Sequence, residues 1–224
     1  MTAPLDPPLG MTEWPATPER LLHPAHTALV ILDMQNKFLG PETKSRASGM
    51  VEVVQGLLAA GRAAGVLPIF VHVNMLDREI GRTGGYLMKM QSITTNQVRG
   101  GPPAQADPVG DAFVPEIAPG PNDIVLQKVR FSAFFSTWLD NLLKNRGIRT
   151  LVLTGVASYG AVIATSFDAA WRDYYVVVPP TGVAGDNDQL HTAALTLIGQ
   201  QSLIDEAVIR QIWSTWAERA EAKP

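Results

Sequence analysis

The sequence contains no cysteine among its 224 residues. Disulfide bonds, thiolate metal sites and a cysteine nucleophile are therefore all excluded. A cytosolic protein needs no disulfides, and a chain of this length buries enough apolar surface to be stable as one domain without them. The absence becomes informative only when the motifs around a candidate active site are placed.

The sequence also lacks a strong excess of charge of either sign and has no long apolar run. The formal net charge is −3, charged residues make up 17% of the chain, and no basic run stands out. Electrostatics therefore predict that neither nucleic acid nor an anionic membrane is a partner. No apolar stretch approaches the roughly 20 residues that cross a bilayer, and residues 1–22 lack the apolar core of a signal peptide. We expect a cytoplasmic protein.

Short apolar runs rich in β-branched residues punctuate the chain. They are continuous rather than alternating, which is typical of strands buried on both faces of a parallel sheet. The predicted strands are Ala28–Leu32, Leu67–Val73, Ile124–Leu126, Thr150–Val156 and Tyr174–Val178.

Segments with the helical spacing of apolar residues separate these strands. The predicted helices are Met50–Ala64, Ser136–Lys144, Ala161–Arg172, Asp188–Leu197 and Glu206–Ala222. Alternating strands and helices indicate an α/β fold, a three-layer Rossmann-like parallel sheet with helices on both faces. We expect an N-terminal extension over residues 1–26 and a single domain over 27–224.

Residues 76–121 form a long segment without a clear strand. Its glycines and the pair Pro102–Pro103 are compatible with a disordered insertion. A connector of this length in a compact domain is more often functional, so we favour a partly helical lid or pocket wall, with Tyr86–Met88 and Met90 facing substrate or a neighbouring subunit.

Candidate catalytic side chains follow the predicted strands, where the active sites of open α/β sheets form. Asp33 comes directly after the first strand, and apolar surroundings would raise its pKa into the range of a general base, although such aspartates are also common turn caps. Lys128 follows the third strand, where it could pair with Asp33, or it could be an ordinary solvated lysine. Phe131 and Phe134 next to it could wall an apolar pocket.

The fourth strand runs into a stretch of small residues, Thr154–Ala161, before a helix. The backbone N–H groups at such a helix start could form an oxyanion hole and would lower the pKa of a thiol placed there. A tight turn needed only for packing is an equally good interpretation of this stretch alone.

Together, these three blocks resemble the isochorismatase-like superfamily over residues 27–197. The segments that carry the resemblance are Val30–Phe38, Lys128–Phe135, Leu153–Ala157 and Thr165–Tyr174. The cysteine hydrolases of this superfamily use an Asp-Lys-Cys triad. The resemblance implies that Asp33 is the general base, that Lys128 is its partner, and that Ala161 stands at the position of the nucleophile. It also implies a cis peptide at Val156–Ala157 and an oxyanion hole made by the N–H groups of Ala157 and Ala161.

Three explanations for Ala161 stay open. It could replace a nucleophilic cysteine, so that the chain binds a small amide, ureido or carbamoyl substrate and leaves it intact. Isochorismatases also lack the cysteine and hydrolyse a vinyl ether by acid chemistry, for which Asp33 would be the acid. A ligand-binding pseudoenzyme is the third explanation, but such a protein has no reason to keep two poorly solvated charges.

The remaining site predictions follow from the same resemblance. The metal-binding nicotinamidases of the superfamily use one aspartate and two histidines, whereas the second strand here offers only His72, so we predict neither a metal nor another cofactor. Besides Phe131 and Phe134, we predict Phe38, Asn74 and Tyr159 as substrate contacts. The partners that we expect are a small-molecule substrate and further copies of the chain, in a dimer or tetramer, with apolar surface supplied by the Trp213–Trp216 stripe and the long insertion.

Overall fold

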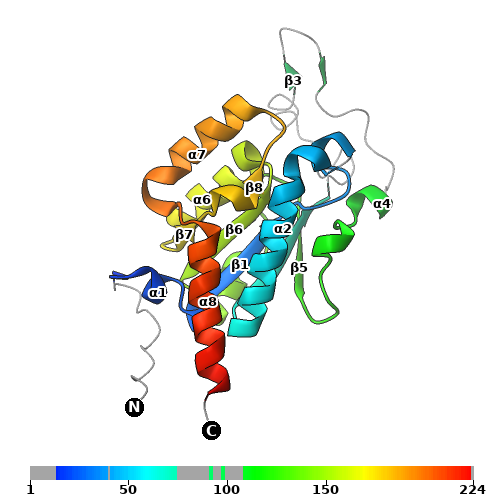
Figure 1. The fold of residues 1–224 in the computed structure, drawn as a ribbon. Coiled ribbons are helices and arrows are strands. Elements are labelled where there is room, and N and C mark those ends of the chain that lie inside the picture. The colour runs from blue at the N-terminus through cyan, green and yellow to red at the C-terminus, as the bar shows by residue number, and fades with distance from the viewer. Residues whose placement is uncertain (1–13, 40, 75–90, 93–96, 99–107, 223–224) are drawn as a thin grey trace.

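The computed structural model describes residues 14–39, 41–74, 91–92, 97–98 and 108–222 (Figure 1). Its centre is a six-stranded parallel sheet with the order β5-β2-β1-β6-β7, in which β8 also pairs with β6. The strands are β1 (Thr27–Leu32), β2 (Leu67–Val73), β5 (Ile124–Lys128), β6 (Thr150–Val156), β7 (Tyr175–Val177) and β8 (Val183–Ala184). A separate antiparallel pair consists of β3 (Gln91–Ser92) and β4 (Gln97–Val98).

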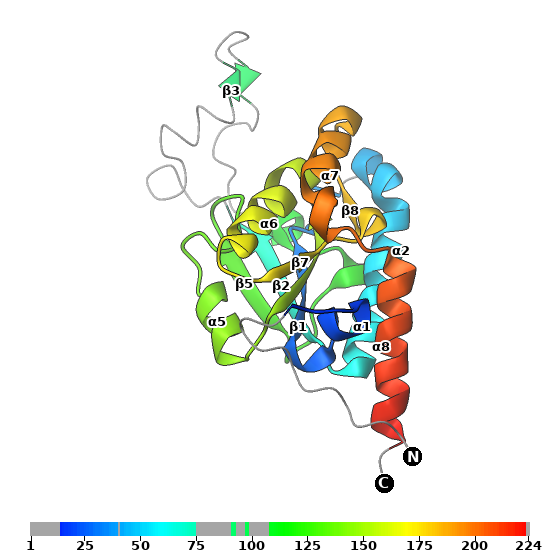
Figure 2. The same ribbon diagram turned by 90° about the vertical axis from the view of Figure 1, so that its left-hand side faces the viewer.

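Helices cover both faces of the sheet, as Figure 2 shows with α2 and α8 on one side and α5 on the other. The long helices are α2 (Pro41–Ala64), α5 (Leu139–Asn145), α6 (Ile163–Ala170), α7 (Asp188–Ser202) and α8 (Glu206–Glu221). The short ones are α1 (Pro18–Leu21), η1 (Pro24–His26), α4 (Pro108–Asp111), η2 (Pro115–Ile117), η3 (Ser158–Val162) and η4 (Pro180–Gly182).

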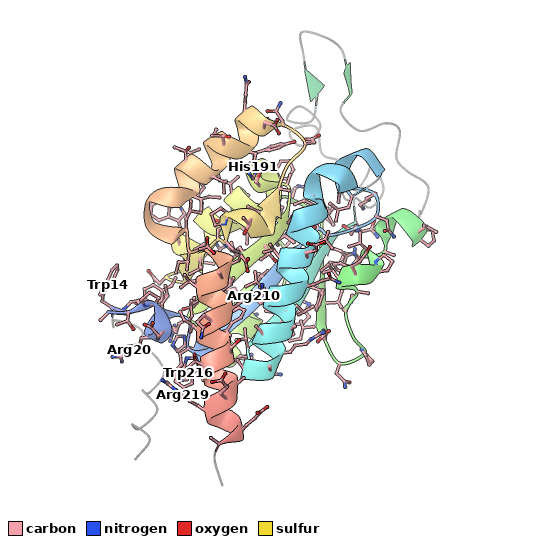
Figure 3. The ribbon with its side chains drawn as sticks, viewed as in Figure 1. Trp14, Arg20, His191, Arg210, Trp216 and Arg219 are labelled. Atoms are coloured by element: carbon pink, nitrogen blue, oxygen red, sulfur yellow. The ribbon has the colours of Figure 1, made fainter. Side chains whose placement is uncertain are left out.

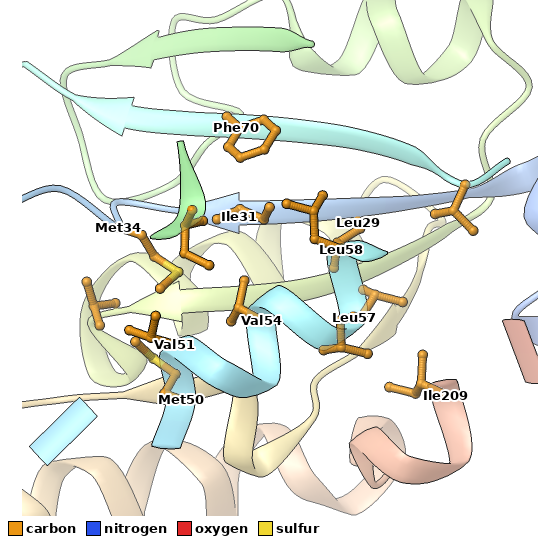
Figure 4. Close-up of a cluster of buried hydrophobic side chains, with 14 of the residues drawn as sticks. Leu29, Ile31, Met34, Met50, Val51, Val54, Leu57, Leu58, Phe70 and Ile209 are labelled. Atoms are coloured by element: carbon orange, nitrogen blue, oxygen red, sulfur yellow. The ribbon is translucent and has the colours of Figure 1, made fainter. Parts of the chain in front are cut away.

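The central strand β1 is buried along its whole length and supplies two separate cores. Leu29 and Ile31 pack with α2 and α8 (Figure 4), whereas Ala28, Val30 and Leu32 pack with α5 and α6 on the opposite face. Successive side chains of a strand point to opposite faces, so a strand that is buried on both sides must be apolar throughout. This confirms the predicted three-layer α/β class.

Two predicted helix starts are wrong, for different physical reasons. Helix α2 begins at Pro41 rather than Met50. Proline suits the first turn of a helix, but the polar residues after it have no apolar stripe that would reveal a helix. Helix α5 begins at Leu139 rather than Ser136, because Ser136 has a φ of 55° and so cannot be part of a right-handed helix.

The C-terminal helix α8 agrees with its prediction to within one residue, but its apolar face is internal. Trp213 is completely buried against α2, where a Cβ atom on Gly61 would lie 3.3 Å from the indole ring. Trp216 is partly buried and contacts the ring of His23. The Trp213–Trp216 stripe therefore packs within the chain and supplies no surface for the predicted oligomer.

The described part of the predicted N-terminal extension also packs onto the domain. Leu22 is completely buried, its carbonyl accepts a hydrogen bond from the Trp213 indole, and the Leu21 carbonyl accepts one from the Thr150 hydroxyl. Of the predicted lid, residues 91–92, 97–98 and 108–121 are described, and the first two form the strand pair β3–β4 in a segment for which no clear strand was predicted. Tyr86–Met88 and Met90 lie outside the described residues. Among the helices that are described, none combines the length and the apolarity needed to cross a membrane.

Candidate active site

Strand register brings the three predicted catalytic blocks to one edge of the sheet. Leu32, the last residue of β1, pairs with Val71 of β2 and Gly155 of β6, and Val73 of β2 pairs with Lys128 of β5. Asp33, Lys128 and the turn after β6 therefore emerge next to each other at the carboxyl ends of neighbouring strands, the usual place for a site in such a sheet.

Asp33 and Lys128 form a buried ion pair at this edge. The Lys128 Nζ donates to Asp33 Oδ2 at 2.6 Å and to the Arg130 carbonyl at 3.0 Å. The side chains are only 1% exposed for Lys128 and 7% for Asp33. Within the described residues, Asp33 Oδ1 has no hydrogen-bond partner. One carboxylate oxygen is thus held by the lysine, and the other is free to exchange a proton.

Burial dominates the electrostatics of the pair. It raises the pKa of Asp33 to about 6, although the positive charge of Lys128 opposes this shift. Burial also lowers the pKa of Lys128, against the stabilising effect of the Asp33 carboxylate. A carboxyl group with a pKa in this range can act as a base near neutral pH and as an acid below it.

The backbone of Asp33 is in the left-handed region, with a φ of 53°. Its N–H donates to the Val71 carbonyl at 2.8 Å, and its carbonyl accepts from the Gln35 N–H at 2.8 Å. Aspartate tolerates this conformation better than most residues, but such a backbone persists only where surrounding contacts enforce it. The chain therefore turns sharply after β1, and the turn fixes the carboxylate.

A network that the sequence interpretation missed supports this turn. Gln35 is completely buried, accepts from the Val73 N–H at 3.0 Å and donates to the Asp111 carbonyl at 2.8 Å. Lys37 Nζ donates to Asp111 Oδ1 at 2.6 Å and to the Val73 carbonyl at 2.7 Å. Gln35 and Lys37 stand in the block that carried the family resemblance, which was the only available signal. Nothing in the sequence connects them to Asp111.

The turn after β6 begins with a cis peptide bond between Val156 and Ala157 and continues as the single π-turn η3. The Ala157 carbonyl accepts from the N–H groups of Gly160 and Val162 at 3.0 and 3.2 Å. Ala161 is buried, and its methyl group has no atom that could attack a substrate or exchange a proton. Close contact of β6 with β1 requires glycine at position 155, because a Cβ atom there would lie 2.0 Å from the Leu32 carbonyl oxygen.

The predicted substrate contacts differ in their surroundings. Phe131 lies over the turn after β6, where its ring is 3.7 Å from the position of a Cβ atom on Gly160. The Asn74 N–H donates to the Lys128 carbonyl at 3.0 Å, and Phe38 is partly buried next to Lys37. Phe134, in contrast, lies in the core.

The surroundings of Phe134 and Tyr159 differ from those of a pocket wall. Phe134 is buried and stacks on Tyr174 with ring centroids 5.9 Å apart, and the Arg172 guanidinium lies 4.9 Å from its ring. These contacts make it part of the core beside α6. Tyr159 is partly buried, and its hydroxyl donates to Asp186 rather than standing free. His72 packs against the Phe113 ring.

Comparison with known proteins identifies the family. The profile of the Isochorismatase domain matches residues 27–204. The chain is similar to the ureidoacrylate amidohydrolase RutB of Enterobacter sp. (strain 638), with 34% identity over 75% of this chain and 80% of the relative. Its identity to the RutB of Methylobacterium radiotolerans is 32%, over 88% of this chain and 86% of the relative.

A solved structure extends the likeness to the fold. The cysteine hydrolase from Pseudomonas syringae pv. phaseolicola 1448A superimposes with a TM-score of 0.73, covering 96% of this chain and all of the other, at 23% sequence identity. With the family profile spanning most of the sequence, this protein belongs to the isochorismatase family.

Proposed function

We propose that this protein has the active-site framework of a hydrolase that acts on a C–N bond of a small amide, ureido or carbamoyl compound. Ala161 stands where the nucleophilic cysteine would be, so the chain binds such a compound without cleaving it. The observation that carries the proposal is the buried Lys128–Asp33 pair, in which Asp33 Oδ1 stays available. The similarity to ureidoacrylate amidohydrolases supports the substrate class.

The proposed chemistry requires a thiol at position 161. Asp33 Oδ1 takes the proton of that thiol, and the thiolate attacks the carbonyl carbon. The N–H groups of Ala157 and residue 161 donate hydrogen bonds to the carbonyl oxygen as it becomes negative. The C–N bond then breaks, the amine leaves with the proton from Asp33, and water hydrolyses the thioester. Lys128 orients Asp33 throughout and stabilises its carboxylate form before and after this proton transfer.

Phe131, Asn74 and Phe38 are the residues that we propose as substrate contacts. The aromatic ring of Phe131 lies over the turn that would hold the substrate carbonyl, and Asn74 follows β2 at the same edge of the sheet. An amide side chain at that place is able to pair with the amide or ureido group of a substrate. Tyr159 is part of the same turn, but its hydroxyl donates to Asp186.

The test is Ala161→Cys compared with the unaltered chain, assayed as ammonia release from primary amides, ureido acids and carbamoyl compounds. We expect turnover from the cysteine variant and binding without turnover from the unaltered chain, measured by calorimetry on the compound that is cleaved. Asp33→Asn in the cysteine variant is the control that should abolish turnover. A cysteine variant that cleaves none of these compounds would contradict the proposal.

A second candidate function follows from the raised pKa of Asp33. A carboxyl group with a pKa of about 6 is able to donate a proton to a vinyl ether, and this chemistry needs no cysteine. The unaltered chain would then hydrolyse isochorismate or a related vinyl ether, and Asp33→Asn would remove the activity. A pseudoenzyme is a weaker candidate because an unused buried ion pair costs stability. It would bind ligand, and Ala161→Cys would add no turnover.

We also propose that the chain forms a homo-oligomer, through an aromatic surface on the layer of α5 and α6. Its members are exposed large side chains from the loop before α5 and from α6, namely Phe135, Trp138, Phe167 and Trp171. The loop and α6 are neighbours, since the Ala133 N–H donates to the Thr165 hydroxyl. Large exposed aromatic groups of this kind usually mark an interface.

Light scattering after size-exclusion chromatography tests the assembly. Trp171→Glu combined with Phe167→Glu should reduce the particle mass to that of one chain. Val208→Glu, at an exposed apolar position on α8, is the matched control and should leave the mass unchanged. A monomeric unaltered chain would refute the assembly.

A further inference from the structure

Two consecutive residues of the π-turn η3 are bound to α7 and to the segment that leads into it. Ser158 Oγ lies 2.9 Å from His191 Nδ1, and the Tyr159 hydroxyl donates to Asp186 Oδ1. Figure 3 shows His191 on the side of α7 that faces the strands. The turn that carries Ala157 and Ala161 is therefore attached through its side chains to a second element of the fold.

The element that receives these bonds is itself well fixed. Strand β8 pairs with β6 at Val183 and Ala184, directly before this segment. At Gly185 the backbone is so close to η3 that a Cβ atom would lie 2.8 Å from the Tyr159 ring and 3.0 Å from Ser158 Oγ. The side chain of Asn187 caps α7 by accepting from the Leu190 N–H at 2.9 Å.

The Ser158–His191 pair has the composition of a nucleophile and its base, but burial excludes that role in this conformation. Ser158 is completely buried, and its hydroxyl is aimed at α7. A nucleophile must reach the carbonyl carbon of a substrate, which a hydroxyl enclosed between η3 and α7 does not do. The pair therefore acts on the substrate only indirectly, through the backbone of the turn.

The small side chains of the turn explain why such an attachment is needed. Ala157, Gly160 and Ala161 leave room for a ligand, but they provide almost no side-chain packing that would keep their N–H groups in one orientation. An oxyanion hole stabilises charge only when its donors are held in place before the charge develops. Ser158 lies between these residues in the chain and is the one that reaches across to α7.

We propose that Ser158 and His191 are positioning residues that hold the N–H groups of Ala157 and residue 161 in the orientation needed to bind a developing oxyanion. This inference rests on the proposed hydrolase function for its catalytic consequence. The mechanical part of the proposal, that α7 fixes the turn, does not depend on the hydrolase function and applies to the unaltered chain.

The mechanical part is tested on the unaltered chain by hydrogen exchange of backbone amides 157–162. His191→Ala and Ser158→Ala should each speed this exchange by about tenfold or more, which corresponds to about 1.4 kcal/mol of lost local stability. Thr192→Ala is the matched control, because Thr192 is exposed on the same helix and its hydroxyl donates only to the Asp188 carbonyl. Equal exchange in all three variants would overturn the proposal.

The catalytic part is tested in the Ala161→Cys variant. His191→Ala should lower kcat by about 10- to 100-fold with little change in KM, because the ground state does not carry the oxyanion charge. His191→Asn should restore most of the loss, since the asparagine side chain places a polar atom close to the position of Nδ1. A change confined to KM, or no rescue by asparagine, would refute the positioning role. If Ala161→Cys itself has no turnover, the proposed function fails, and the exchange experiment still decides whether α7 holds the turn.

Discussion

Lys128 Nζ lies 2.6 Å from Asp33 Oδ2, and among the described residues nothing is bound to Oδ1 of the same carboxylate. The two oxygens thus have different environments although they belong to one group. Lys128 stabilises the negative charge on Oδ2, whereas burial destabilises the charged form of the whole carboxylate. The balance leaves a proton acceptor that is held by the lysine, has a pKa of about 6 and lies at the carboxyl end of β1.

Removal of the lysine should show how strongly this pair is coupled. We expect Lys128→Met to reduce the free energy of unfolding by about 3–5 kcal/mol at pH 8, because it leaves a buried carboxylate without its partner. At pH 5 the loss should be smaller, since Asp33 can take up a proton. Urea unfolding at both pH values measures this. Lys144→Met removes the exposed pair with Asp140 and should cost no more than about 0.5 kcal/mol.

The pH profile of activity separates the two candidate chemistries. In Ala161→Cys, Asp33 must be deprotonated to accept the thiol proton, so the rate should rise with pH through about 6. Vinyl ether hydrolysis by the unaltered chain would need the protonated acid, and its rate should fall over the same range. Initial rates between pH 4.5 and 8 distinguish the two directions, and a profile that is flat around pH 6 would exclude Asp33 from both.

His26 should make folding sensitive to acid. It is completely buried, neither ring nitrogen has a partner within the described residues, and burial lowers its pKa to about 4. The unfolded chain binds a proton near pH 6.5, whereas the folded chain does not. The contribution of neutral His26 to stability is therefore complete above about pH 6.5 and is lost as the pH falls toward 4. His26→Phe should lower the signed slope of unfolding free energy against pH by about 1.4 kcal/mol per pH unit in this range.

Asp33 has the opposite effect on the pH dependence of unfolding free energy, over nearly the same pH interval. Its pKa is raised in the folded state, so its contribution to stability is present below about pH 4 and is lost as the pH rises through about 6. The two groups partly cancel in the unaltered chain. Of these two contributions, His26→Phe leaves only that of Asp33, so stability should fall as the pH rises. Asp33→Asn leaves only that of His26, so stability should rise more steeply with pH. Urea titrations from pH 4 to 7 would detect both changes.

Gly155 should tolerate no side chain. A Cβ atom there would lie 2.0 Å from the Leu32 carbonyl oxygen, and the φ of 107° disfavours any other residue. We expect Gly155→Ala to cost more than about 3 kcal/mol or to prevent folding, because β1 and β6 would have to separate. Gly147→Ala is the matched control, since Gly147 also has a positive φ but has free space around it, and it should cost about 1 kcal/mol. Similar stability of both variants would contradict this reading of the strand contact.

The sequence was most informative where each local signal had a single cause. The strands and the face of α8 follow from burial, which selects apolar residues at fixed spacing. Asp33 and Lys128 were identifiable because charged residues directly after buried strands are unusual, and the strand register brings them together.

Features that depend on distant contacts were not predictable. Gln35 and Asp111 are 76 residues apart, and their hydrogen bond depends on how the chain returns to the sheet. Ser158 stands in the small-residue stretch Thr154–Ala161 and His191 in the predicted helix Asp188–Leu197, and only the packing of α7 makes them partners. Aromatic character alone did not distinguish Phe131, beside the turn, from Phe134, in the core.

The hydrogen bond between the Trp213 indole and the Leu22 carbonyl joins residues 191 positions apart. Leu22, Trp213 and the α2 residue Gly61 meet in one packed cluster, so the core on that face of the sheet is complete only when α8 is in place. Until α8 docks, the apolar face of α2 is open to solvent. A chain in which α8 has not docked should therefore depend on chaperones, and deletion of α8 should yield an aggregating chain rather than a shorter stable domain.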